Sequence, residues 1–228
     1  MSMPIFDRKS LVRLAGLLAS LTLVAGCLPP PELAGRSDAG PRAVTAIKVS
    51  QQDIVVVGPK GYCVDPSSTQ ERASGSFVIL ASCSALVAGS PSAPGTPGVL
   101  TALVSSPGDP PTAPTINQLK QYFESQAGLV ALAQDGRANS VTLRKTVSEN
   151  DVLYLSLQDD SANRAPKLSE TSWRAVFSLK GRMVVLTVTG HKDIPLSDSD
   201  ARRTLERFVV TMRAANRLND AGASAGNG

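Results

Sequence analysis

The first 27 residues separate a targeting segment from the part of the chain that must build the fold. Arg8, Lys9 and Arg13 give a basic start, and residues 14–26 that follow carry no charge. A basic start, a short apolar run and small residues before a cleavage point are typical of a secretory signal. The run of about 13 residues is shorter than the roughly 20 that a helix needs to span a bilayer. We therefore predict that residues 1–26 are a signal peptide and not a permanent membrane helix.

The end of this segment, Val24-Ala25-Gly26-Cys27, resembles the lipobox of bacterial lipoproteins. The resemblance implies that a diacylglycerol is attached to the Cys27 thiol and that cleavage after Gly26 makes Cys27 the acylated first residue. Two or three acyl chains hold a protein firmly on a membrane face, since each buried CH₂ adds about 0.8 kcal/mol. An ordinary signal peptide with an incidental cysteine is the alternative interpretation.

The residue after the cysteine bears on which membrane is involved. In the usual sorting pattern of bacterial lipoproteins, an Asp at this position retains the protein in the inner membrane, and this chain has Leu28 instead. The resemblance therefore implies an envelope protein whose partner is membrane lipid, bound through Cys27 at the periplasmic face of the outer membrane.

Removal of residues 1–26 from the 228 leaves 202, which suits one domain with a tether and a tail. We expect a Pro-rich tether at 27–45, a single domain at 46–217 and a disordered tail at 218–228, because Gly, Ala, Ser and Asn dominate that end. The signal holds three basic residues and one acidic residue, so the formal net charge falls from +4 to +2. A charge this small, on a secreted chain, argues against a nucleic-acid partner.

Two cysteines remain in the mature chain besides Cys27. Cys63 and Cys83 are an even pair in an oxidising compartment, which favours a disulfide between them. A bridge that closes a loop of about 21 residues stabilises the fold by roughly 3 kcal/mol in the chain-entropy model. The alternative is a reactive thiol.

Hydrophobic periodicity and turn signals predict the elements of the domain. We expect strands at 53–58, 77–83, 98–106, 140–147, 152–157, 172–179 and 183–189, with polar stretches at 66–76 and 159–170. One helix should start at 116 behind the cap Thr115, with Gly128 as an interruption, and a second should span 195–216. The second helix has an apolar stripe of Leu205, Phe208, Val209 and Met212. Its solvent side should carry Arg202, Arg203, Glu206, Arg207 and Arg213.

The order of these elements is strands, helix, antiparallel strands, helix. This order predicts an α+β fold in which about two helices pack on an antiparallel sheet. The stretch 77–83 is apolar on both faces and should lie centrally in that sheet.

Several short motifs in the domain carry a resemblance to known proteins. They are GYCVDP at 61–66, FVILASC at 77–83, WR at 173–174, GR at 181–182, VTG at 188–190 and RAAN at 213–216. Together with the lipobox, they resemble a family of uncharacterised alphaproteobacterial lipoproteins, over nearly the whole mature domain. The element order is also similar to the PsbP-like α/β sandwich, whose members are mostly binding or assembly proteins. This second resemblance concerns fold and does not by itself argue function.

No catalytic, cofactor or metal motif stands out. The chain has no phosphate-binding glycine loop, no C-x-x-C and one histidine, His191. Cys63 could pair with His191 as a nucleophile only if it were free of Cys83. Paired carboxylates could serve a hydrolase, but nothing in the sequence selects a pair. We therefore expect no cofactor and no metal.

Tyr62, Trp173 and Arg174 are the most distinctive polar and aromatic residues, and a binding groove is one interpretation of them. The other is that Trp173 is a core residue, with Arg174 on the wet face of the sheet. The leading function hypothesis is a non-catalytic binding or assembly role with an envelope protein partner. An envelope hydrolase or thiol-dependent enzyme is the first alternative, and a carrier of a small apolar ligand is the second.

Overall fold

The computed structural model describes residues 43–51, 53–88, 90, 94, 97–107, 114–161 and 165–225. These residues belong to one unit, Ala39–Gly228. The predicted signal peptide, the acylation site Cys27 and the first part of the tether lie outside the described residues.

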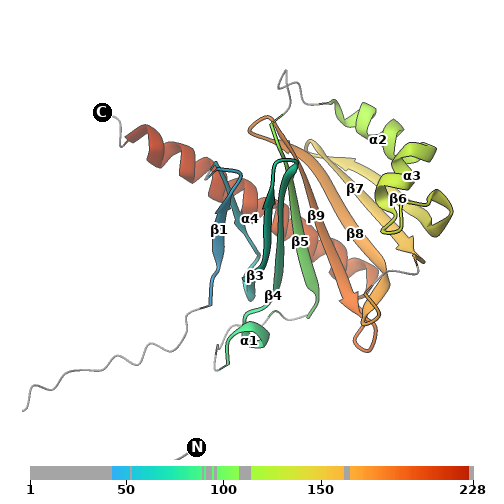
Figure 1. Cartoon of the computed structure of the whole chain (residues 1–228), viewed down its shortest axis with the longest axis horizontal. Helices are drawn as coiled ribbons and strands as arrows, with labels where there is room; N and C mark the ends of the chain where they lie inside the picture. The colour runs from blue at the N-terminus through green and yellow to red at the C-terminus, as the bar shows by residue number, and fades with distance from the viewer. Residues whose placement is uncertain are drawn as a thin grey trace, which may run out of the picture. The chain divides into compact units, whose positions relative to one another are not determined.

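Seven strands form one antiparallel sheet in the order β3-β4-β5-β9-β8-β7-β6 (Figure 1). The strands are β3 Tyr62–Arg72, β4 Gly75–Ser82, β5 Val99–Ser105, β6 Val141–Glu149, β7 Val152–Asp159, β8 Leu168–Leu179 and β9 Arg182–His191. A separate antiparallel hairpin consists of β1 Ala46–Val49 and β2 Ile54–Val57.

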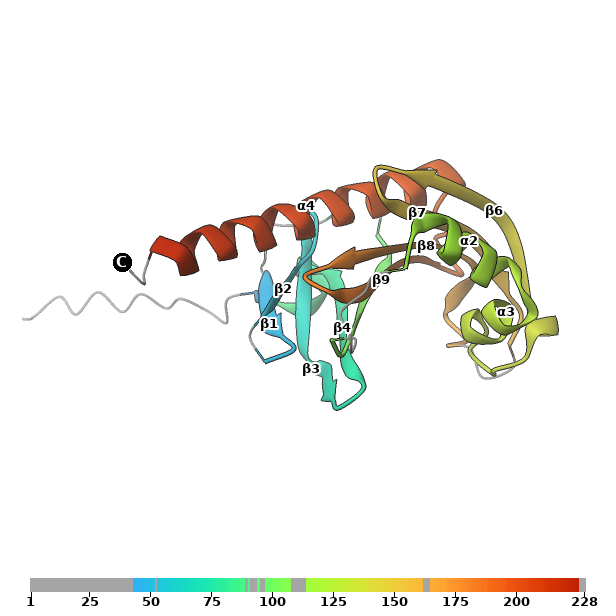
Figure 2. The same cartoon turned by 90° about the horizontal axis from the view of Figure 1, so that it is seen from above.

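Helices lie on both faces of this sheet (Figure 2). The long helix α4 (Asp198–Ala225) covers one face, and α2 (Ile116–Glu124) and α3 (Gln126–Leu132) lie on the other. A single turn, α1 (Cys83–Leu86), follows β4, and a 3₁₀ turn, η1 (Ala138–Ser140), precedes β6. The predicted α+β class, with an antiparallel sheet and packed helices, is therefore confirmed. The described residues hold more strands and helices than expected.

The main core lies between α4 and the sheet. The apolar stripe of α4 is confirmed, because Leu205, Phe208 and Met212 are all fully buried there. The helix starts where the sequence offers a cap, since Ser197 Oγ accepts the Asp200 N–H at 3.1 Å. The β1–β2 hairpin packs into the same core through Ile54 and Val56.

A smaller core lies under α2 and α3. Leu153, Leu155 and Leu157 alternate along β7 and point into it, as the period of a strand requires. Thr115 caps α2 by accepting the Gln118 N–H at 3.3 Å, as predicted. The predicted interruption falls at Ser125, which caps α3, and not at Gly128. Gly128 has a different role, because a Cβ there would lie 2.0 Å from the Tyr122 carbonyl oxygen.

Polar segments account for most differences from the predicted elements. Residues 66–72, expected as part of a polar stretch, continue β3, an edge strand whose pairing with β4 shifts register between Asp65 and Gln70. An edge strand keeps its backbone pairing without burying alternate side chains, so it lacks the apolar period that sequence patterns detect. For the same reason β1 was not expected as a strand. Residues 168–171, also expected as a polar stretch, extend the interior strand β8 across a register shift between Leu168 and Ser172. Helix α4 extends to Ala225 instead of ending at Asn216.

None of the helices in the described ranges is long and apolar enough to cross a membrane.

Candidate functional site

The structure separates the three residues of the predicted groove. Tyr62 on β3 and Trp173 on β8 belong to the core under α4, and each is about 4% exposed. Burial raises the pKa of Tyr62 to about 12. Arg174 follows Trp173 and therefore points to the opposite face, where it lies across from Leu155 and Thr187. The structure therefore does not bring these three side chains together in one groove.

Trp173 has one polar contact in this core. Its Nε1 donates to Asp198 Oδ1 at 2.8 Å, at the first turn of α4. Lys145 Nζ donates to Asp198 Oδ2 at 2.9 Å, and these contacts lower the pKa of Asp198, the Lys145 hydrogen bond most of all. Trp173 is thus a core residue whose indole N–H fixes the start of α4, as the core interpretation expected.

The predicted cysteine pair lies at disulfide distance. The Sγ atoms of Cys63 and Cys83 are 2.00 Å apart, and the bond joins the start of β3 to the start of α1. Both residues are buried. Within this structure Cys63 is therefore bonded and not free to act as a nucleophile beside His191.

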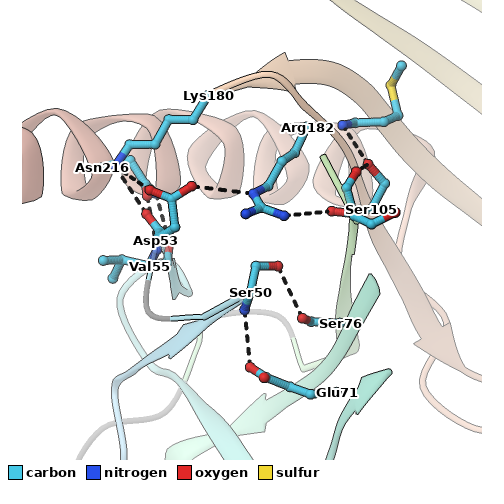
Figure 3. Close-up of polar contacts among 11 residues, drawn as sticks. Ser50, Asp53, Val55, Glu71, Ser76, Ser105, Lys180, Arg182 and Asn216 are labelled. Atoms are coloured by element: carbon cyan, nitrogen blue, oxygen red, sulfur yellow. Dashed lines mark hydrogen bonds and ion pairs between the residues drawn. The ribbon is translucent and has the colours of Figure 1, made fainter. Parts of the chain in front are cut away.

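The polar cluster of most interest lies where the β1–β2 turn meets the β8–β9 turn and the ends of β4 and β5 (Figure 3). We call it the hairpin junction and define it by Ser50, Asp53, Ser76, Ser105 and Arg182. Arg182 is only 9% exposed. Its Nε donates to Asp53 Oδ2 at 3.4 Å, and its Nη1 donates to the Ser105 carbonyl oxygen at 3.4 Å. Lys180 Nζ lies 3.8 Å from Asp53 Oδ1, so Asp53 sits between two cations.

Hydroxyl groups form the other half of the hairpin junction. Ser50 Oγ and Ser76 Oγ share a hydrogen bond at 3.2 Å, and the Ser50 N–H donates to Glu71 Oε1 at 3.1 Å (Figure 3). Ser105 Oγ accepts the Met183 N–H at 3.0 Å. The two paired hydroxyls are partners of each other and not of a base, so neither is set up as a nucleophile.

Two tight turns position this cluster. Ser50 and Gln51 have φ of 55° and 63°, and Lys180 and Gly181 have φ of 49° and 68°. Lys180 and Gly181 form a two-residue hairpin loop of the type whose twist matches that of the flanking strands, whereas the β1–β2 connection is longer, at 50–53. These turns carry Asp53 out of one hairpin and Lys180 out of another, and so bring the two side chains together.

An open pocket of about 340 Å³ lies at the hairpin junction. Its lining residues include two arginines, one glutamate and two serines: Arg72, Arg182, Glu71, Ser76 and Ser106. This mixture can donate and accept hydrogen bonds with a polar ligand or a polar loop of another protein. Across the described residues, no group of three or more His, Cys, Asp or Glu is placed to hold a metal ion.

Sequence reasoning missed the hairpin junction. Asp53 and Arg182 are 129 positions apart, and no local pattern joins them. The one local signal was the GR motif at 181–182, whose glycine lies in the β8–β9 turn. Comparison of the chain with protein-family models, curated proteins and solved structures gives no significant match.

Proposed function

We propose that this chain is a lipid-anchored protein of the cell envelope and that its domain binds another envelope component without catalysing a reaction. The observation that carries the proposal is the lipobox-like end of the first segment, Val24-Ala25-Gly26-Cys27. Acylation of Cys27 would hold the domain at the periplasmic face of the outer membrane, behind a tether that begins with three prolines. The bonded pair Cys63 and Cys83 supports an oxidising compartment.

The hairpin junction is the surface that we assign to binding. Its side chains are held in place by mutual hydrogen bonds, which lowers the entropy lost when a ligand orders them. The pocket is lined by charged and hydroxyl groups, which suit a polar partner better than a small apolar ligand. We also propose the PsbP-like α/β sandwich as the fold type, and the sheet with helices on both faces supports it. That analogy agrees with a binding or assembly role but does not argue it.

The anchor is tested by the intact mass of the protein purified from membranes. We expect a chain that begins at Cys27 and carries the mass of two or three acyl chains, and we expect Cys27→Ala to abolish that mass and the membrane association. A membrane-free chain cleaved at another position would overturn the anchor.

The same sample tests the thiol-enzyme alternative. Alkylation before and after reduction should label Cys63 and Cys83 only after reduction. Free thiols at both positions in the native protein would favour a thiol-dependent enzyme over the non-catalytic binding role. A turnover activity that one side-chain substitution abolishes would defeat the non-catalytic proposal directly.

The binding surface is tested by photo-cross-linking in intact cells. A photoreactive residue in place of Arg72, exposed at the rim of the pocket, should give a discrete cross-linked product. The same residue in place of Tyr122, 45% exposed on α2, is the matched control and should not. Glu71→Lys should weaken the product at position 72, because it reverses a charge in the pocket lining. Identical products from positions 72 and 122 would overturn the assignment of this surface.

A further inference from the structure

Arg174 is a charged residue that the contacts described so far leave unexplained. It lies on β8 with its side chain on the α2–α3 face of the sheet, between Leu155 of β7 and Thr187 of β9. The core interpretation of Trp173 placed Arg174 on the wet face of the sheet. Arg174 does lie on the face opposite Trp173, but its Nε atom is buried. The residue as a whole keeps some exposure, so the guanidinium group lies at the boundary between the core and an opening.

The buried nitrogen has no hydrogen-bond partner. Nε of Arg174 is the one buried side-chain nitrogen or oxygen left without a partner among the described residues. The guanidinium group of Arg174 also forms no ion pair within 4.0 Å with any of these described residues. Desolvation by burial lowers the pKa of Arg174, and only the charge of Asp159 opposes that effect. A guanidinium group has five N–H donors in a fixed fork, and native proteins rarely leave such donors buried and unpaired.

A small pocket of about 50 Å³ lies at this guanidinium group. Its lining includes hydroxyl donors on two strands, Ser172 of β8 and Thr187 and Thr189 of β9. One water molecule needs roughly 10–15 Å³ of such space, so the pocket has room for a group of a few heavy atoms. A planar carboxylate has this size, and its two oxygens match the fork of a guanidinium group.

The carboxylates that line the pocket are already engaged elsewhere. Asp159 is 3% exposed, and its two oxygens accept the Gln134 N–H at 3.2 Å and the Ser161 N–H at 2.9 Å. Glu170 forms an ion pair with Lys192 at 3.5 Å. Asp159 therefore moderates the charge of Arg174 without occupying its fork. Two acidic neighbours also disfavour a ligand with two negative charges, so a singly charged carboxylate is favoured over phosphate.

We propose that Arg174, with the hydroxyl groups of Thr187 and Ser172, binds the carboxylate of a small organic acid or of a peptide C-terminus. The two sources share the same chemistry at the pocket and differ only in what lies outside it. This site is separate from the hairpin junction and does not depend on the membrane anchor, so its failure leaves the proposed function untouched.

The test follows the Arg174 Nε–H resonance by NMR in the mature acylated protein, held in detergent micelles. Sodium acetate is titrated at constant ionic strength against sodium chloride. We expect a saturable shift with acetate, a weaker response to phosphate and none with chloride, while the Arg202 Nε–H, which donates to Glu206 Oε1, stays unchanged as an internal control. The resonance is assigned by its loss in Arg174→Lys.

Two further comparisons sharpen this test. Thr187→Val keeps the shape of the side chain and removes one donor, so the acetate dissociation constant should rise on the order of fivefold. A short N-acetylated peptide with a free C-terminus is compared with its C-terminal amide. If the peptide acid binds with a lower dissociation constant than acetate and the amide does not bind, the site is assigned to peptide C-termini. If the peptide acid binds no more tightly than acetate, the site is assigned to small organic acids. A linear, unsaturable shift with acetate, or equal responses to acetate, phosphate and chloride, overturns the proposal.

Discussion

At the scale of single residues, Asn216 ties the β1–β2 hairpin to α4. Its Oδ1 accepts the Val55 N–H at 2.9 Å, and its Nδ2 donates to the Val55 carbonyl oxygen at 2.8 Å (Figure 3). Its Nδ2 also donates to the Met212 carbonyl oxygen at 2.8 Å. Asn216 is 1% exposed. Because both backbone groups of Val55 depend on one side chain, we expect this residue to decide whether the hairpin stays docked.

Asn216→Ala should therefore destabilise the protein by about 2–4 kcal/mol, the cost of leaving two partly buried backbone groups without partners. Urea unfolding of the mature protein in micelles measures this loss. Arg217→Ala, at the next and exposed position of the same helix, should cost less than about 0.5 kcal/mol. Equal losses in the two variants would refute the proposed role of Asn216.

Asp135 gives a prediction about pH. A hydrogen bond from Ser140 Oγ at 2.7 Å, followed by contacts from Arg137, holds the pKa of Asp135 at about 2. Because this pKa is lower in the folded than in the unfolded state, the stabilising contribution is present above about pH 4. It is lost as the pH falls toward 2. The midpoint of urea unfolding should decline less steeply over this window in Asp135→Asn than in the wild type. Glu124→Gln, at an exposed helix position, should leave the slope unchanged.

Single residues also mark the limit of what the sequence predicted about the site. The disulfide pair and the core position of Trp173 could be foreseen, because cysteine number, compartment and alternation are local signals. The burial of Arg174 Nε and the pairing of Asp53 with Arg182 could not be foreseen. They arise from the order of strands in the sheet, and side-chain alternation along a strand does not determine its neighbours.

At the scale of elements, α4 is clamped onto the β6–β7 hairpin by arginines that the sequence placed on its solvent side. The guanidinium group of Arg202 lies 3.7 Å from the centre of the Tyr154 ring and forms ion pairs with Glu149 and Glu206, both at 2.8 Å. Arg213 donates to the carbonyl oxygens of Asn150 and Asp151 in the same hairpin turn. The guanidinium group of Arg213 also lies over an aromatic ring, 4.9 Å from the centre of the Phe177 ring, so both arginines combine ring stacking with polar contacts.

Arg202→Lys should destabilise the protein by about 1–2 kcal/mol, because an ammonium group cannot stack on the ring and form both ion pairs at once. Arg203→Lys is the matched control, since the Arg203 side chain is 59% exposed and should contribute less than about 0.5 kcal/mol. Chemical unfolding of both variants measures the two losses in unfolding free energy. A larger loss for Arg203→Lys would contradict the clamp.

Two features of the β3–β4 turn require a glycine at Gly75: a positive φ and a close approach of another strand. Gly136 has the positive φ alone, so a comparison of the two positions distinguishes the two effects. Gly75 has a φ of 142°, and a Cβ there would lie 2.3 Å from the Val104 carbonyl oxygen. Gly136 has a φ of 70°, and a Cβ there meets nothing within 4 Å. We expect Gly136→Ala to cost about 1 kcal/mol for the backbone conformation alone, and Gly75→Ala to cost at least about 2 kcal/mol more. Thermal unfolding compares the two, and equal costs would show that the close contact at Gly75 relaxes freely.

At the scale of the whole molecule, the sequence predicted best those elements whose side chains are buried in a core. The strands that bury one or both faces were expected within a few residues of their observed ends, because a packed core imposes a period on the sequence. Most of the edge strand β3 and the hairpin strand β1 were not, because backbone pairing can hold such a strand while its side chains stay polar. The other edge strand, β6, was expected at 140–147, and the far end of α4 was also missed. The second face of the sheet is also unevenly covered. Leu103 of β5 is 48% exposed, on the face where α2 and α3 lie over β6 and β7.

The disulfide Cys63–Cys83 supplies stability to the β3–β4 edge of the sheet. It joins the start of β3 to the residue after β4, across a sequence separation of 20. A loop of this length implies roughly 3 kcal/mol of stabilisation through the unfolded state.

We therefore expect reduction with a phosphine to lower the free energy of unfolding of the mature protein by about this amount. A variant with both Cys63→Ala and Cys83→Ala should start near the reduced value and should not respond to the reductant, because the thioether expected at Cys27 is not reducible. A wild-type protein whose unfolding ignores reduction would show that β3 is held by pairing and packing alone. In that case the hairpin junction, which is built on the same edge, would not depend on the redox state of the compartment.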